Sequence, residues 1–233
     1  MCPFGLDFPL RRSILYGGAC MNQENKKDVV AALHRENIVR AAAALFAQKG
    51  FDASSIDDIA RESGYSRRTI YIYGKSKENL LCLAIAQELR TLRDGLRRTQ
   101  EISGFFAQYD AICAELLAFH RRCPLSTSVV RKSAVSDNPL PAEQLILSLG
   151  TEINALLADF LAQGQREGLV RPDVFPALDA QLLTTALEAQ FSLWDARKDY
   201  LISVFSLDEK AFLARVREQL LRGLLLASKG DAR

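Results

Sequence analysis

The chain has 233 residues, a formal net charge of +2 and 48% apolar residues, which is enough to bury a sizeable core in one or two domains. This composition excludes a disordered chain, and we find no apolar run near the length needed to span a bilayer. Its five cysteines form no C-x-x-C pair, which argues against a disulfide framework or zinc knuckle and favours a reducing cytoplasm. Apolar residues recur at the helical period almost everywhere, so the sequence predicts an all-α fold.

Residues 1–26 are expected to form a disordered tail, because they lack the apolar core of a signal peptide. Two hypotheses explain this tail. In the first, it is not native coding sequence and translation begins at Met21, since two glycine codons shortly upstream can spell a ribosome-binding site. In the second, it is a native arm whose Arg11 and Arg12 could touch a DNA minor groove. The nucleotide sequence of the gene would test the first hypothesis.

Residues 27–75 are predicted to form a three-helix domain. The first helix runs from about Lys27 to Gly50 and supports the next two. Its apolar face comprises Ile38, Ala41, Ala42, Leu45 and Phe46.

The stretch from Ser54 to Leu80 is typical of a helix-turn-helix. Ser55 and Ser66 can each cap a short helix by accepting from the amide three residues on. Gly64 between the two helices can adopt the positive φ of a tight turn, and we expect it to let the helix backbones approach closely. Gly74 is expected to end the second helix.

Positive charge concentrates in this stretch. Between Arg61 and Lys77 there are five cations and one anion, a local net charge of +4 against +2 for the whole chain. In a helix-turn-helix the second helix lies in the major groove, with its first residues at the base edges. The charge therefore predicts binding to double-stranded DNA.

Individual side chains can be assigned to DNA contacts. Arg67 and Arg68 are placed to read bases, and Thr69 can touch a thymine methyl group or a phosphate. Tyr71, Tyr73 and Lys77 are expected to hold phosphates, with help from the serine that caps each helix. The alternative is that the arginines lie on a solvated face and the tyrosines belong to the core.

The run from Arg35 to Leu81 resembles the N-terminal domain of the TetR (tetracycline-repressor-like) transcriptional regulators. The likeness rests on the pattern A-x-x-L-F-x-x-x-G-F/Y from Ala42 and on T-x-Y-x-Y-x-x-S-K-E-x-L from Thr69. It implies a homodimeric repressor that binds an inverted-repeat operator and is released by a ligand. Carried over by position, the family's DNA contacts are Ser55, Arg67, Arg68, Thr69, Tyr71, Tyr73 and Lys77, to which we add Ser66. Family members often have Phe or His where Tyr73 stands, so its role is packing or phosphate binding.

Residues 76–233 are predicted to form a helical bundle for effector binding and dimerisation. Ser76 can cap a long connector helix, whose movement in the resembling family relays ligand binding to the recognition helices. Turn-forming stretches beyond it leave five more helical segments. These are expected at about 101–122, 127–136, 141–167, 176–197 and 207–227.

The last two of these helices are expected to form the homodimer as an intermolecular four-helix bundle. Their apolar faces are wide enough to serve both a monomer core and a partner, and the alternative is that they only close the core of one monomer. The residues concerned are Leu182, Leu183, Ala186, Leu187, Ala189, Phe191, Phe212, Leu213, Val216, Leu220, Leu221, Leu224 and Leu225.

A stripe of apolar and aromatic residues in the bundle predicts a pocket for a small lipophilic or aromatic effector. The candidates are Phe105, Tyr109, Cys113, His120, Phe160, Phe191 and Trp194. The alternative is that these residues only fill the core, which would leave a DNA-binding regulator without an effector.

A helical Cys/His enzyme is the rival class, because His120 and Cys123 are close in the sequence. No third metal ligand flanks them, and no G-x-S-x-G, H-E-x-x-H or phosphate loop occurs. We therefore expect no catalytic, metal or cofactor site, and no membrane partner.

Overall fold

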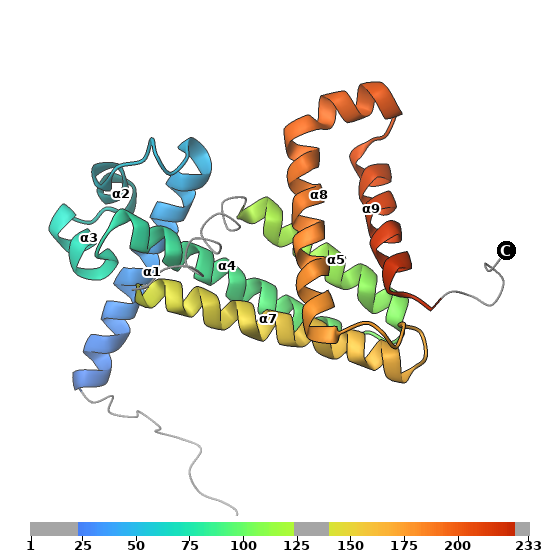
Figure 1. Ribbon diagram of the computed structural model, residues 1–233. Helices are drawn as coiled ribbons and strands as arrows, with labels where there is room; N and C mark the ends of the chain where they lie inside the picture. The colour runs from blue at the N-terminus through green and yellow to red at the C-terminus, as the bar shows by residue number, and fades with distance from the viewer. Residues whose placement is uncertain (1–22, 124–139, 227–233) are drawn as a thin grey trace, which may run out of the picture.

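The protein is seen in a computed structural model that describes residues 23–123 and 140–226 (Figure 1). Within these ranges the prediction of an all-α fold is confirmed, because the described chain consists of helices, loops and one isolated bridge between Val170 and Leu225. The helices are α1 (Gln23–Lys49), α2 (Ile56–Ser63), α3 (Arg67–Gly74), α4 (Lys77–Thr99), α5 (Phe105–Arg122), α7 (Pro141–Arg166), α8 (Pro176–Phe205) and α9 (Glu209–Leu224). The first of them begins inside the predicted tail, at Gln23. The segment predicted at 127–136 and residues 1–22 lie outside the described residues.

The helices α1, α2 and α3, called the head below, pack around one apolar core. The predicted face of α1 is buried, and Ile59 of α2 and Ile70 of α3 insert into the same core. Ser55 and Ser66 cap α2 and α3 as expected. These caps fix where each short helix starts, and the buried isoleucines fix which face turns inward.

Two glycines of the head have different roles, and α3 ends at Gly74 as predicted. Gly64 has the positive φ of 73° that was predicted, but a Cβ there would meet nothing within 4 Å, so close helix approach does not require it. At Gly74 a Cβ would lie 2.8 Å from Cδ2 of Leu80, so here the small residue does allow close packing. The positive φ that follows the end of α3 falls on Lys75, at φ 63° and ψ −58°.

The connector α4 belongs to both cores. Ser76 caps it by accepting from the amide of Asn79 at 3.0 Å, as predicted. Leu80 and Ala84 pack in the core of the head, whereas Ile85 and Leu89 pack in the core of the second unit. Packing therefore continues across the predicted boundary at residue 76.

The second unit is a bundle of α4, α5, α7, α8 and α9. Figure 1 shows α4 and α7 side by side, with α8 and α9 standing across their far ends. Ion pairs supplement the apolar contacts along α4: Arg93 and Arg97 both reach Glu152 of α7, at 3.3 and 3.4 Å. Arg122 of α5 reaches Glu88 of α4 at 2.6 Å.

Two predicted boundaries were wrong. The segment expected from residue 101 begins at Phe105, because 3.2 Å turn hydrogen bonds close the end of α4 and Gly104 then adopts a φ of 91°. The segment expected to end at Arg197 bends there, with φ −136° and ψ 18°, and continues as helix to Phe205. Local composition does not reveal that a helix resumes after a bend.

The long helix α7 corrects one statement about the sequence. By length and apolar composition it could cross a membrane, although we found no such run in the sequence. In the structure it packs along α4 and α8, with Ile146, Leu149 and Leu157 buried in the bundle core. A core helix of a water-soluble bundle meets the same criterion, so its composition is weak evidence for a membrane.

Candidate nucleic-acid interface and ligand sites

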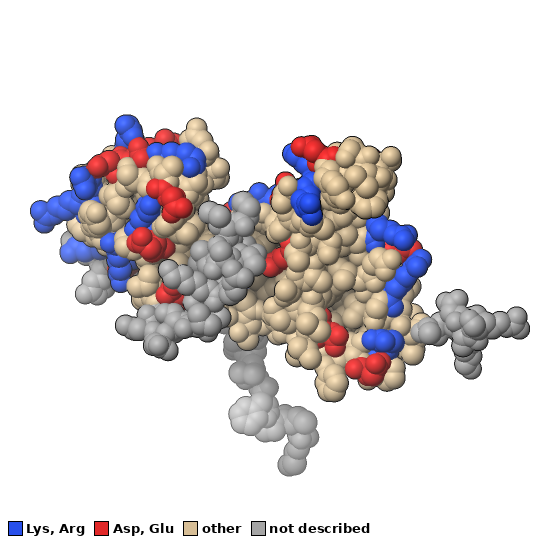
Figure 2. All heavy atoms as spheres, turned by 45° about the horizontal axis from the view of Figure 1, so that its top comes forward, with Lys and Arg blue, Asp and Glu red and all other residues tan. Residues whose placement is uncertain are grey.

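The recognition helix α3 presents its first turns outward. Ile70, 1% exposed, anchors it in the head core, while Arg67, Arg68 and Tyr71 lie on its exposed sides. Figure 2 shows basic side chains gathered around this end of the molecule, with acidic ones among them. The arrangement exposes Arg67, Arg68 and Tyr71 as predicted for contacts with DNA, whereas Thr69, Tyr73 and Lys77 are partly buried.

The two arginines differ in their surroundings. Arg67 Nε lies 3.1 Å from Asp57 Oδ1, and both side chains are well exposed. Such surface pairs contribute little, so Arg67 can exchange Asp57 for DNA at small cost. Arg68 forms no ion pair within residues 23–123 and 140–226. Ile72, which sequence reasoning did not assign, is also exposed and could contact a thymine methyl group.

The hydroxyl groups predicted to touch DNA are already used in caps. Ser66 Oγ accepts from the amide of Thr69 at 3.1 Å and shares a hydrogen bond of 2.9 Å with Thr69 Oγ1. Ser55 Oγ donates to Asp58 Oδ2 at 2.7 Å and accepts from the amide of Asp58. Their first role is therefore to hold helix starts, where free backbone amides can meet phosphates.

The carboxylate of Asp58, in the first turn of α2, accepts hydrogen bonds from several groups. Lys49 Nζ donates to it at 2.6 Å, and Ser55 donates through both its hydroxyl and its amide. The hydrogen bond from Lys49 is the largest cause that holds the pKa of Asp58 well below its usual range, followed by the two bonds from Ser55. The folded state therefore favours the ionised carboxylate.

We expect Asp58→Asn to lower the melting temperature at pH 7. Because the pKa of Asp58 is lowered on folding, its stabilisation is complete above the ordinary value, about 3.9, and is lost as the pH falls through the folded value. The difference in melting temperature between the two proteins should therefore shrink below about pH 4. Asp57→Asn, which leaves Lys49 and Ser55 in place, is the control. A difference that stays constant down to pH 2 would contradict this assignment.

Of the two roles predicted for Tyr73, the structure shows the packing role. It is half-buried against the head core, and its ring centroid is 5.4 Å from that of His34. His34 Nδ1 shares a 2.7 Å hydrogen bond with the hydroxyl of Tyr65 in the turn before α3. Sequence reasoning missed His34 and Tyr65, because nothing local links two residues 31 positions apart. A phosphate contact by Tyr73 stays a prediction.

Lys77 is tied to the loop between α1 and α2. Its Nζ donates to the carbonyl oxygens of Phe51 and Ser54, each at 3.0 Å, and lies 4.2 Å from the centroid of the Phe51 ring. The ammonium group thus joins the start of α4 to the head. The third N–H of the ammonium group would then make the predicted phosphate contact.

We expect Lys77→Met to lower both the thermal stability and the affinity for all DNA sequences, because it removes a cation and its hydrogen bonds to the carbonyl oxygens of Phe51 and Ser54. If Lys77 meets a phosphate, the slope of log affinity against log salt should fall by about 0.9 per subunit. Lys75→Met is the matched control for charge alone. An unchanged melting temperature would show that the two carbonyl contacts are unimportant for the fold.

The predicted effector residues come together, but mainly as packed core. Phe105 stacks on Phe160 with ring centroids 4.6 Å apart, and Trp194 packs on Phe212 at 5.2 Å. Tyr109 donates to the carbonyl oxygen of Arg217 at 2.9 Å. Periodicity correctly placed these residues inside, without indicating how much space their neighbours fill.

Burial also sets the chemistry of this core. It raises the pKa of Cys113 to about 11 and that of Tyr109 far above its ordinary range. His120 Nε2 lies 2.9 Å from Asp195 Oδ2. In the part of the chain that the structure describes, no group of three potential metal ligands gathers around His120 or elsewhere.

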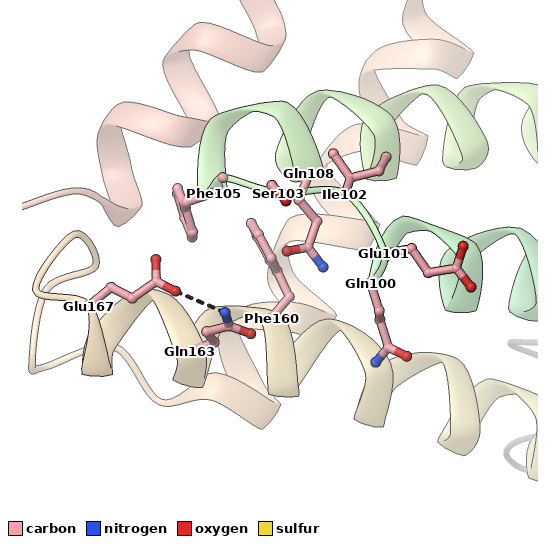
Figure 3. Close-up of a pocket in the computed structure, with 10 residues that line it drawn as sticks. Gln100, Glu101, Ile102, Ser103, Phe105, Gln108, Phe160, Gln163 and Glu167 are labelled. Atoms are coloured by element: carbon pink, nitrogen blue, oxygen red, sulfur yellow. Dashed lines mark hydrogen bonds between the residues drawn. The ribbon is translucent and has the colours of Figure 1, made fainter.

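Two hollows border the packed core. One, of about 340 Å³, lies between the α4–α5 connection and the end of α7, and includes Phe105 and Phe160 (Figure 3). The other, of about 310 Å³, is a groove between α5, α8 and α9 that includes Cys113 and Phe191. Tyr109, His120 and Trp194 line neither hollow. Neither of these two hollows is therefore lined by all seven predicted effector residues.

The faces predicted for the dimer divide between core and surface. Six are buried in the monomer: Leu183, Leu187, Phe191, Phe212, Val216 and Leu224. Leu182 and Ala189 are exposed on α8. Leu178, which was not predicted, extends the exposed side of α8, since positions 178, 182, 185 and 189 follow helical spacing.

The N-terminal part matches a known family. Residues 38–82 match the family described as bacterial regulatory proteins, tetR family. The uncharacterised regulator YerO of Bacillus subtilis is 46% identical over 50 residues, which are 22% of this chain and 17% of that protein. The transcriptional repressor KstR2 of Mycolicibacterium smegmatis is 27% identical over 156 residues, which are 61% of this chain and 70% of that one. The match thus spans about a sixth of YerO and over two thirds of KstR2.

Solved structures share the fold over most of this chain. The regulator FadR from Bacillus subtilis, in complex with stearoyl-CoA, is 18% identical, with a TM-score of 0.62 over 81% of this chain and 98% of that chain. The MbdR regulator from Azoarcus is 21% identical, with a TM-score of 0.61 over 83% of this chain and 100% of that chain. At these identities the likeness shows a common architecture.

Proposed function

Because the chain belongs to the TetR family of bacterial regulatory proteins, we propose that it is a homodimeric transcriptional repressor that binds an inverted-repeat operator and releases it when a small molecule binds. The observation that carries this proposal is the exposed start of α3. Its arginines face outward while Ile70 anchors the helix in the head.

This geometry supports the proposed DNA contacts. Arg67 and Arg68 read base edges in the major groove, where a guanidinium group can bind guanine with two hydrogen bonds. The helix starts and the exposed Tyr71 meet the phosphates. The exposed stripe of α8, together with the half-buried leucines of α9, pairs with the same surface of a second subunit and sets the distance between the two recognition helices.

The groove between α5, α8 and α9 is our candidate site for the effector. Its floor includes Leu117, Phe191 and Leu213, and three cations line it: Arg121, Lys210 and Arg217. Arg121 pairs with Glu209 and Arg217 with Asp110, while Lys210 forms no ion pair among the described residues. An apolar floor with an available cation suits a lipophilic ligand that has a negatively charged end. The stearoyl-CoA complex of FadR supports this class of ligand.

The relay would run through α4, which is part of both cores. A ligand that favours a different angle of α4 would change the spacing of the two heads, and would weaken operator binding only by its differential affinity for that state. The ion pairs from Arg93 and Arg97 to Glu152 would have to adjust in such a movement. The proposal places the protein in the cytoplasm, with no catalytic activity, metal or cofactor.

A mobility-shift experiment tests the function directly. Purified protein is mixed with the intergenic DNA beside its own gene, and a bound inverted repeat is the expected result. Scrambling one half-site should abolish the specific complex. Equal binding to scrambled DNA would overturn the repressor assignment. Release by palmitate but not by hexadecane would support the effector groove, and insensitivity to both would favour a regulator without this class of effector.

A further inference from the structure

The hollow at the α4–α5 connection is separate from the effector groove. It is lined by the connecting residues Gln100 to Gly104, by the first turn of α5, by Phe160 and Gln163 of α7 and by Glu167 directly after α7. Its volume of about 340 Å³ is that of a small-molecule site. No residue of α8 or α9 lines it, so the proposed dimer leaves it open.

Gln108 is the central feature of this hollow. The residue is only 9% exposed, and its side-chain amide forms no hydrogen bond with any residue in the described ranges. Figure 3 shows the amide directed into the hollow, between Phe160 and Gln100. Both polar atoms of this amide can be reached through the hollow, since neither is among the atoms sealed from solvent without a partner. A ligand that pairs with the whole amide must offer both an acceptor and a donor, because a carboxamide has both.

The start of α5 provides further donors at the same place. Its N-cap is Gly104, which has no side chain to accept from the first amides of the helix. Those amides lack intrahelical partners, and both Gly104 and Phe105 line the hollow. The positive end of the helix favours an acceptor here and disfavours a cation.

Charge disfavours anions in this hollow. None of the described residues that line it is basic, and Glu167 supplies a carboxylate, whereas Figure 3 shows the carboxylate of Glu101 directed away from Gln108. Gln163 Nε2 donates to Glu167 Oε1 at 2.8 Å (Figure 3). An anionic ligand would be repelled by the carboxylate of Glu167, and a cation beside Gln108 would face the helix start. The stacked rings of Phe105 and Phe160 form an apolar edge beside these polar groups.

We propose that this hollow binds an uncharged aromatic carboxamide. Its carbonyl oxygen accepts from the α5 amides or Gln108 Nε2, its N–H donates to Gln108 Oε1, and its ring contacts Phe160. This site is distinct from the effector groove, and its assignment is independent of operator binding.

Three probes of nearly the same shape test the charge preference: benzamide, benzoate and benzamidine. Each is titrated into the 15N-labelled protein while the side-chain NH2 signal of Gln108 and the backbone signals of Phe106 and Ala107 are followed. Benzamide should shift these signals saturably, with an affinity at least ten-fold higher than that of either charged probe. Tighter binding of benzoate or benzamidine, or no shift with benzamide, would overturn the proposal.

Two variants test the role of Gln108. Gln108→Leu should abolish the benzamide shifts at Phe106 and Ala107. Gln108→Glu, which retains the side-chain shape, should reverse the preference toward benzamidine. Gln144→Leu, at the exposed start of α7, is the matched control. Unchanged benzamide binding by both Gln108 variants would refute the site.

Discussion

Replacing Arg67 and Arg68 together by alanine is expected to remove most of the discrimination between operator and unrelated DNA. A bidentate contact of arginine with guanine is worth about 1–3 kcal/mol of discrimination. The ratio of specific to non-specific affinity should therefore fall on the order of 100-fold or more for each half-site. Both arginines lie on the exposed side of a helix anchored by Ile70, so the fold should remain intact.

Fluorescence anisotropy on operator and scrambled duplexes at several salt concentrations measures this ratio. The variant Arg90→Ala/Arg166→Ala removes the same charge from exposed positions on α4 and α7, and it should keep the ratio. Circular dichroism checks that α3 still folds in the double arginine variant. If that variant retains the wild-type ratio, base reading cannot be assigned to the start of α3.

The head was the part of the molecule that sequence could predict most fully, because its determinants are local. The caps at Ser55, Ser66 and Ser76 each act over three residues, and the structure has all three. The contacts that close the head are long-range. Lys77 reaches Phe51, and His34 reaches Tyr65, over 26 and 31 positions. No spacing rule connects such pairs.

In the bundle, periodicity predicted burial correctly but not empty space. Phe105, Tyr109 and Phe160 are inside as expected, and the two hollows described above lie at the edges of their core. The unpaired amide of Gln108 had no signal in the sequence, because a glutamine is ordinarily exposed. Its significance comes from the way the α4–α5 connection encloses it.

The position of α4 in both cores gives the proposed relay a physical basis. Leu80 and Ala84 are fixed to the head, and Leu92 and Leu96 to the bundle, with one uninterrupted helix between them. If the end of α4 that lies in the bundle rotates, the head should therefore move with it as a rigid body. Gly95 sets no limit on this rotation, because a Cβ there would meet only the carboxylate end of the flexible Glu115 side chain, which can move aside.

Leu178→Glu combined with Leu182→Glu is expected to convert the protein to a monomer and to abolish tight operator binding. These leucines are 58% and 55% exposed in the single chain, yet they lie on the side of α8 that we assign to the dimer. In a two-fold interface the four introduced carboxylates would be buried and would repel one another. A monomer binds only one half-site, so we expect operator affinity to fall on the order of 100-fold or more.

Sedimentation velocity measures the oligomeric state, and anisotropy on full and half-site duplexes measures the affinity. The affinity of the monomeric variant for the half-site duplex should equal that of the wild-type protein, because α3 and its arginines are unchanged. Ile102→Glu, an exposed apolar residue outside α8 and α9, is the control and should remain dimeric. If the double leucine variant still sediments as a dimer, subunits pair through another surface, and the spacing of the two recognition helices must be set elsewhere.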